Sequence, residues 1–131
     1  MVSESSIAPG TDLDPAVLAF IKCHVTSSLK WEAMRVLGAR EGAWVSAQEV
    51  ARATHRGQAE VEAAVGELVH EGVIQQAASP PLRYRVPLNE PTSVVLQRLI
   101  AGATHSLELR SIIAAHLGSL RLPPAAALRA S

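Results

Sequence analysis

The chain has 131 residues, a formal net charge of zero and a hydrophobic fraction of 48%. This length suits one compact domain with a single core, and the apolar content is that of a globular protein rather than a disordered one. The zero net charge gives no overall attraction to nucleic acid, and a single cysteine, Cys23, excludes an internal disulfide framework.

The sequence pattern carries no targeting or membrane signal. The N-terminal residues are polar and acidic, whereas a secretion signal starts with basic residues and continues with apolar ones. The longest run without charge, residues 72–82, contains two prolines and is far shorter than the ~20 apolar residues of a membrane helix. We therefore expect a cytoplasmic protein that does not associate with membranes.

The first predicted element is a helix over residues 14–30. Asp12 or Asp14 can cap it, Pro15 suits its first turn, and apolar residues recur on one face at helical spacing. The helical pattern then starts again in the segment WEAMRVLGAR, which Gly42 ends. The two patterns are compatible with one continuous helix.

The next two predicted helices are separated by a tight turn. Ser46 is followed three positions later by Glu49, which is the spacing of a capping box and predicts a short helix to about Ala53. A longer helix over residues 58–71 follows, and Gly72 ends it.

A small β-hairpin is predicted after these helices. Leu82, Tyr84 and Val86 alternate with Arg83 and Arg85 beyond a turn rich in Ser and Pro. The alternation places the apolar side chains inward and the two arginines on the opposite, outward side.

The last predicted element is a long helix over residues 92–117, with Gly102 as its weak point. Residues 1–11 and 118–131 are expected to be disordered tails.

Short helix, tight turn, longer helix and two-stranded hairpin is the order of elements in a winged helix-turn-helix. The segments that carry this likeness are, in chain order, WVSAQEVARAT, HRGQ, AEVEAAVGELVHEGVI and LRYRV. Over residues 31–86 the chain resembles small bacterial transcriptional regulators of the MarR-like kind. The resemblance implies a mostly α fold with a three-helix core and a β-hairpin wing. Length and the predicted tails indicate one domain over residues 12–117, and the resemblance implies dimerisation through flanking helices 14–30 and 92–117.

The second helix of the predicted helix-turn-helix does not have the composition of a DNA-reading helix. In such regulators this helix enters the major groove and its outward side chains contact bases and phosphates. Residues 58–71 instead hold four glutamates and no Lys or Arg, and DNA carries one negative charge per ~1.7 Å of axis. We therefore expect its outward face to be a protein-docking surface, formed by Ala59, Ala63, Gly66 and His70.

Arginines elsewhere keep DNA binding open as an alternative. The possible DNA contacts are Arg52, Arg56, Arg83 and Arg85, with Lys30 as a further candidate. The explanation we prefer for the two wing arginines is that they solvate an exposed hairpin face. We expect any DNA binding to be weak.

The last predicted helix has an apolar side wider than one small domain usually covers. A helix of this kind commonly packs on its own domain and on a second subunit, so we expect a homodimer. The predicted dimer contacts are Leu99, Ala103, Leu107 and Ile113. The alternative is that the first helix covers the whole strip within one chain.

No pattern of catalytic or metal-ligating residues is recognisable. Cys23 and His24 are adjacent on a helix and so diverge by about 100°. His105, Glu108 and His116 lie too far apart along their helix for one metal. Cys23 is expected to be an apolar filler, and Trp44 and Tyr84 core residues. We expect no enzyme, no metal and no cofactor.

The sequence thus predicts a transcription-linked regulatory protein that acts mainly through contacts with an unidentified protein partner and through homodimerisation. The alternative is a DNA-binding repressor that uses its wing arginines. A more distant alternative, which the resemblance implies, is a small-molecule sensor whose ligand lies between the long helices.

Overall fold

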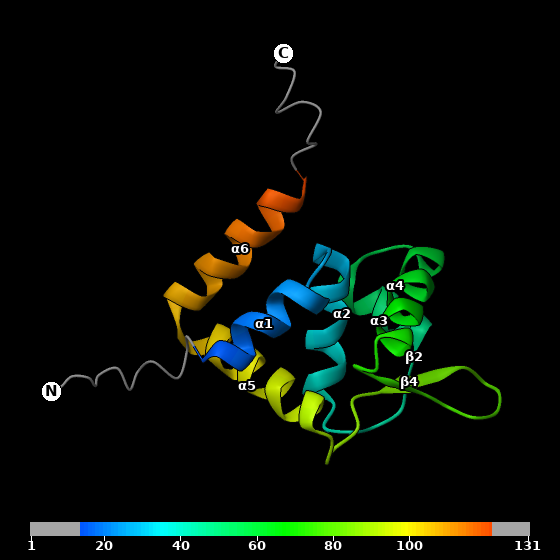
Figure 1. Ribbon diagram of the computed structural model, residues 1–131. Helices are drawn as coiled ribbons and strands as arrows, with labels where there is room; N and C mark the ends of the chain where they lie inside the picture. Colours follow the sequence, from blue (N-terminus) through cyan, green and yellow to red (C-terminus); the bar gives the residue numbers. More distant parts are fainter. Residues whose placement is uncertain (1–13, 122–131) are drawn as a thin grey trace, which may run out of the picture.

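The computed structural model describes residues 14–121 as a mostly helical chain with one small antiparallel sheet (Figure 1). The elements in chain order are α1 (Pro15–His24), α2 (Ser28–Ala39), β2 (Val45–Ser46), α3 (Ala47–Thr54), α4 (Gln58–His70), β3 (Gln75–Gln76), β4 (Arg83–Arg85), α5 (Pro91–His105) and α6 (Leu107–Arg121). Helices α3 and α4 lie with the sheet at one end of the molecule, and α6 lies at the other (Figure 1).

The sheet has three strands in the order β2-β4-β3. Tyr84 on the central strand pairs with Val45 of β2 on one side and with Gln76 of β3 on the other. The predicted hairpin is therefore present, but it gains a third strand that the sequence did not indicate. Tyr84 and Val86 face inward as expected, whereas Leu82 precedes β4 and is 51% exposed.

Helices α2, α3 and α4 pack against one another and share the central core with the sheet. Leu37 of α2, Val50 of α3 and Leu68 of α4 are all fully buried. Burial of a Leu or Val side chain stabilises the fold by roughly 1.5–3 kcal/mol, so this contact holds the three helices together. A mostly helical chain with a three-stranded antiparallel sheet is compatible with the predicted fold class.

The predicted first helix is shorter than expected, and it is not continuous with the second. Asp14 caps α1 as predicted, its Oδ1 accepting from the Ala16 backbone N at 2.8 Å. The chain leaves the helix after His24, and Ser27 caps α2 by accepting from the Lys30 backbone N at 3.1 Å. The prediction of one flanking helix over residues 14–30 is wrong, because a competing cap starts a new helix within it.

The predicted last helix over residues 92–117 is two helices, broken at Ser106 rather than weakened at Gly102. Ser106 is extended (φ −118°, ψ 117°), and its Oγ accepts from the Leu109 backbone N at 3.1 Å. Arg110 satisfies carbonyls that the end of α5 leaves free, because it donates to the oxygens of Ala103 and Thr104.

Helix α6 continues to Arg121, so the prediction that a disordered tail begins at residue 118 is wrong for residues 118–121. The rest of that predicted tail, and the predicted tail over residues 1–11, lie outside the described residues.

The break at Ser106 also changes what covers the wide apolar side of the last predicted helix. Helix α1 packs against both α5 and α6. Leu99, Ala103 and Ile113 are therefore buried within the chain, with at most 7% of each residue exposed. These three residues are not available to a second copy, which corrects their assignment as dimer contacts. Leu107, the fourth, is 71% exposed.

Candidate functional site

The outward face of α4 is open and nearly flat. Ala59, Ala63, Gly66 and His70 are all exposed, as their helical spacing predicted. A Cβ atom added to Gly66 would meet no atom of another element within 4 Å, so nothing among residues 14–121 covers the middle of this face. We call these four residues the α4 ridge.

Glutamates surround the α4 ridge, and α4 carries no Lys or Arg. Glu60 accepts from the Gly57 backbone N at 3.2 Å and so helps to begin the helix. Glu62 accepts from the Gln58 side chain at 3.1 Å, and Glu67 is 63% exposed. The exposed surface around the ridge is therefore negative.

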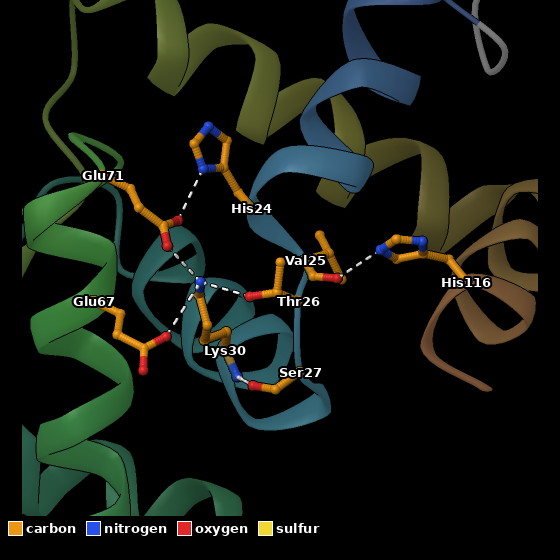
Figure 2. A network of polar contacts seen from close by, with 8 residues as sticks. All are labelled: His24, Val25, Thr26, Ser27, Lys30, Glu67, Glu71 and His116. Atoms are coloured by element: carbon orange, nitrogen blue, oxygen red, sulfur yellow. Dashed lines mark hydrogen bonds and ion pairs between the residues drawn. The ribbon is translucent and has the colours of Figure 1, made fainter. Parts of the chain in front are cut away.

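Lys30, predicted above as a possible DNA contact, instead binds the C-terminal end of α4. Lys30 is only 2% exposed, so that assignment is wrong. Its Nζ donates to Glu71 Oε2 at 2.7 Å and to Thr26 Oγ1 at 2.7 Å, and it lies 3.5 Å from Glu67 Oε1 (Figure 2). The buried ammonium thus joins α2 to two carboxylates at the end of α4.

Two histidines extend this network, as Figure 2 shows. His24 Nδ1 lies 2.9 Å from Glu71 Oε1, and His116 Nε2 lies 2.9 Å from the backbone oxygen of Val25. Burial raises the pKa of Glu71, but the hydrogen bonds from Lys30 and His24 outweigh it and leave that pKa below its usual value. The network ties α4 and α6 to the segment between α1 and α2.

A sequence signal for the burial of Lys30 exists. Met34 and Leu37 lie four and seven residues beyond Lys30, which places the lysine on the core face of α2. Both residues are fully buried. A cation on a core face needs a partner, but Glu71 lies 41 positions away, and no local pattern identifies it.

The four arginines proposed as DNA contacts differ in whether their guanidinium groups have partners in the structure. Arg56 pairs with Glu32 at 3.5 Å. Arg85 donates to Gln75 Oε1 at 2.8 Å, and its guanidinium lies 4.4 Å from the centre of the Trp44 ring. Arg52 and Arg83 are exposed and form no ion pair within residues 14–121.

Two residues expected in the core are not buried. Trp44 is 38% exposed, and its ring lies beside the Arg85 guanidinium rather than inside the core. Cys23 is exposed on α1 instead of filling an apolar position.

The described residues offer no obvious metal centre or membrane segment. Within residues 14–121 no group of three or more His, Cys, Asp or Glu side chains lies close enough to hold a metal ion. The helices of the same part of the chain are all too short or too polar to cross a membrane. His105 and Glu108 are exposed, whereas His116 contacts Val25.

No family model, curated protein or solved structure matches this chain.

Proposed function

We propose that the protein is a cytoplasmic, transcription-linked regulatory protein with a winged-helix fold, which acts mainly by docking another protein on the α4 ridge. The observation that carries this proposal is the composition of the exposed α4 face. It presents small side chains surrounded by glutamates, in the position where a DNA-reading helix presents cations.

The order of elements supports the fold assignment. Helices α3 and α4 are joined by a short turn and pack on α2, and the hairpin of β3 and β4 follows α4 directly. The loop between these strands extends away from the helices in the manner of a wing (Figure 1).

Electrostatics favour a protein partner over DNA for the α4 face. A glutamate about 6 Å from a phosphate would cost about 0.7 kcal/mol at the dielectric constant of water and about 3 kcal/mol at an effective value of about 20. Residues 58–71 hold four glutamates and no Lys or Arg. Lys30 pairs with Glu67 and Glu71, but Glu60 and Glu62 form no ion pair within residues 14–121. We expect DNA binding no tighter than the non-specific range of roughly 10⁻⁴–10⁻⁶ M at physiological salt.

The same charges specify the partner. Small side chains at positions 59, 63 and 66 allow a second helix to approach closely, and the surrounding glutamates favour Lys or Arg beside that contact. The partner surface is therefore a helix with a narrow apolar stripe bordered by basic residues. The fastening of α4 through Lys30 and Glu71 keeps the ridge preformed, which lowers the entropy cost of binding.

Capture of partners from a lysate of the native cell tests this proposal. Nuclease treatment should leave the captured proteins bound, and Ala63→Arg should release them, because a long cation then stands in the middle of the ridge. Ala115→Arg is the matched control, since Ala115 is also exposed but lies on α6. Equal capture by the two variants would refute docking on the ridge.

A DNA-binding repressor is the second candidate, and the exposure of Arg83 on the hairpin favours it. Anisotropy titration at ~150 mM salt separates the candidates, because the docking proposal requires weak and non-selective binding. Nanomolar, sequence-selective binding that Arg83→Ala abolishes would establish the repressor instead.

A homodimer is also part of the proposal, and one exposed residue, Leu107, supports it. Among the four predicted contacts only Leu107 is exposed, and it is the most exposed large apolar side chain in the described residues. Pairing of two copies around Leu107 would remove this side chain from water.

A further inference from the structure

A pocket of about 350 Å³ lies where the segment after β4 meets the first half of α5, and we call it the α5 pocket. Its apolar wall is formed by Pro87, Leu88, Val94 and Ala101. Six large apolar side chains are exposed among residues 14–121, and two of these, Leu88 at 64% and Val94 at 50%, line this one pocket. Single exposed apolar residues are common, but neighbours in one pocket indicate a surface that another segment covers.

The polar residues of the α5 pocket are already engaged or buried. Gln97 Nε2 donates to the backbone oxygen of Gly38 at 3.2 Å, and the Arg98 guanidinium pairs with the Asp14 carboxylate. Ser93 is only 2% exposed, so it contributes little to the pocket surface. The surface left for an occupant is therefore mostly apolar, which suits the side chains of a polypeptide segment.

The apolar wall is set in place by a glycine at the end of α2. Gly42 has a positive φ of 87°, and a Cβ atom added to it would lie 3.0 Å from Leu88 Cγ. The absence of a side chain at Gly42 thus allows the segment after β4 to approach closely, which fixes the position of Leu88. The pocket is therefore preformed, and this lowers the entropy cost of filling it.

The N-terminal segment, residues 1–13, leaves the described part of the chain at the edge of this pocket. Asp14 is the first described residue, and its partner Arg98 lines the pocket. Residues 122–131 instead follow the C-terminal end of α6, which Figure 1 shows at the far side of the molecule from the beginning of α5. The N-terminal segment is thus the one that begins beside the α5 pocket.

We infer that the N-terminal segment binds in the α5 pocket, with Ile7 packed between Leu88 and Val94. Seven residues separate Ile7 from Asp14 and reach up to about 23–25 Å when extended. Val94 lies one helical turn from Arg98, about 6 Å along α5, so the reach is ample. The bound segment would cover Leu88 and Val94 and withhold them from other chains.

Charge and tethering favour this occupant over a separate molecule. Side chains two positions apart in an extended chain point the same way, so Asp12 would join Asp14 beside Arg98, whose side chain is 49% exposed. A short tether holds the segment at an effective concentration on the order of 1 mM, so a contact with an intrinsic Kd of about 1 mM is about half occupied.

Paramagnetic broadening of backbone amide signals in NMR spectra tests this inference, which is independent of docking on the α4 ridge. A nitroxide label is attached at Ser5→Cys in a chain that also carries Cys23→Ser, because Cys23 is otherwise the only thiol. We expect the label to reduce the Gln97 and Ala101 signals at least about twofold, and to leave the Ala63 signal on α4 unchanged.

Two variants separate binding from mere proximity of the tethered label. Ile7→Ser and Val94→Ser remove an apolar contact without changing charge, and each should lower the broadening of Gln97 and Ala101 at least about threefold. The matched controls are Val2→Ser in the same segment and Leu120→Ser, which alters a side chain as exposed as Val94 but outside the pocket. Both should leave the broadening unchanged. Thermal melts should show that all four variants are folded, since Val94 and Leu120 are about half exposed.

Three results would overturn the inference. The first is an absence of broadening at Gln97 and Ala101, and the second is broadening that Ile7→Ser leaves as strong as in the labelled parent chain. The third comes from a mixture of isotope-labelled protein without nitroxide and nitroxide-labelled protein without isotope. Broadening in that mixture would show that the segment binds the pocket of a second copy instead of its own.

Discussion

Replacement of Lys30 by methionine should destabilise the protein more than any other single change of a charged residue in the network. The lysine side chain is 3% exposed and that of Glu71 is 27% exposed. Lys30→Met therefore leaves a partly exposed carboxylate with His24 as its remaining side-chain partner. The methionine has nearly the same length, so the change removes charge without opening a cavity.

Removal of one partner from a fully buried ion pair costs about 3–5 kcal/mol. Because water still reaches part of Glu71, we expect a smaller loss, of about 2–3 kcal/mol in the free energy of unfolding. For a chain of this size each kcal/mol lowers Tm by about 3–5 °C. The expected decrease in Tm is therefore about 6–15 °C.

Urea denaturation followed by circular dichroism measures this loss. Lys22→Met is the matched control, because Lys22 is exposed at the end of α1, and it should change the free energy of unfolding by less than about 0.5 kcal/mol. Combination of Lys30→Met with Glu71→Leu should recover at least half of the loss, because the less exposed of the two carboxylates is then gone, and the remaining one, that of Glu67, is 63% exposed to water. A loss below about 1 kcal/mol for Lys30→Met, or no recovery in the double variant, would refute this account of the network.

The remaining predictions concern pH, the ridge and the apolar face of α6. The folded-state pKa of Glu71 lies below its unfolded value near 4.5. The ionised Glu71 carboxylate should therefore stabilise the fold fully above pH 4.5, and this stabilisation should be lost as the pH falls through the folded-state pKa. Unfolding curves of wild type and Glu71→Gln should therefore converge at acidic pH; a constant difference would contradict this. Gly66→Ala should stabilise the isolated protein by up to about 1 kcal/mol, since the new methyl group meets open space, and a lower Tm would be the opposite result. Ile113→Asp should unfold the protein by burying a charge, whereas Leu107→Asp should stay folded and turn any dimer seen by light scattering into a monomer. Leu107→Asp leaving a wild-type dimer intact would place the interface elsewhere.

Interactions between residues close in sequence could be predicted. Ser46 and Glu49 form the expected capping box in both directions, with backbone contacts of 3.1 and 3.2 Å. Asp14 caps the first helix, and the exposure of the α4 ridge follows directly from helical periodicity. These features need only three or four neighbouring residues, so their free energies are set locally.

The breaks in the long helical patterns depend on a competition between continuing one helix and starting a new one at a serine cap, and the two differ little in free energy. The helical pattern starts again shortly after Ser27 and continues past Ser106, so periodicity alone is compatible with unbroken helices at both places. A serine cap gains about 1 kcal/mol, comparable to the cost of leaving the helix, and tertiary packing decides between them. Burial of Val25 and of Leu109 favours the broken arrangement.

Only the tertiary structure decided which residues would meet. It brought Lys30 to Glu71 across 41 positions, and it packed α1 against α5 and α6. Leu99 and Ile113 are buried within the chain, which removes these residues from any partner surface. A pocket beside Trp31 arises in the same way, because its walls come from α2, α5 and α6, and the last two are separate helices owing to the break at Ser106. Periodicity specifies which side of a helix is apolar. Which segment covers that side depends on contacts between distant parts of the chain. For each such contact, the free energy gained by burial must exceed the entropy lost in closing the loop between them.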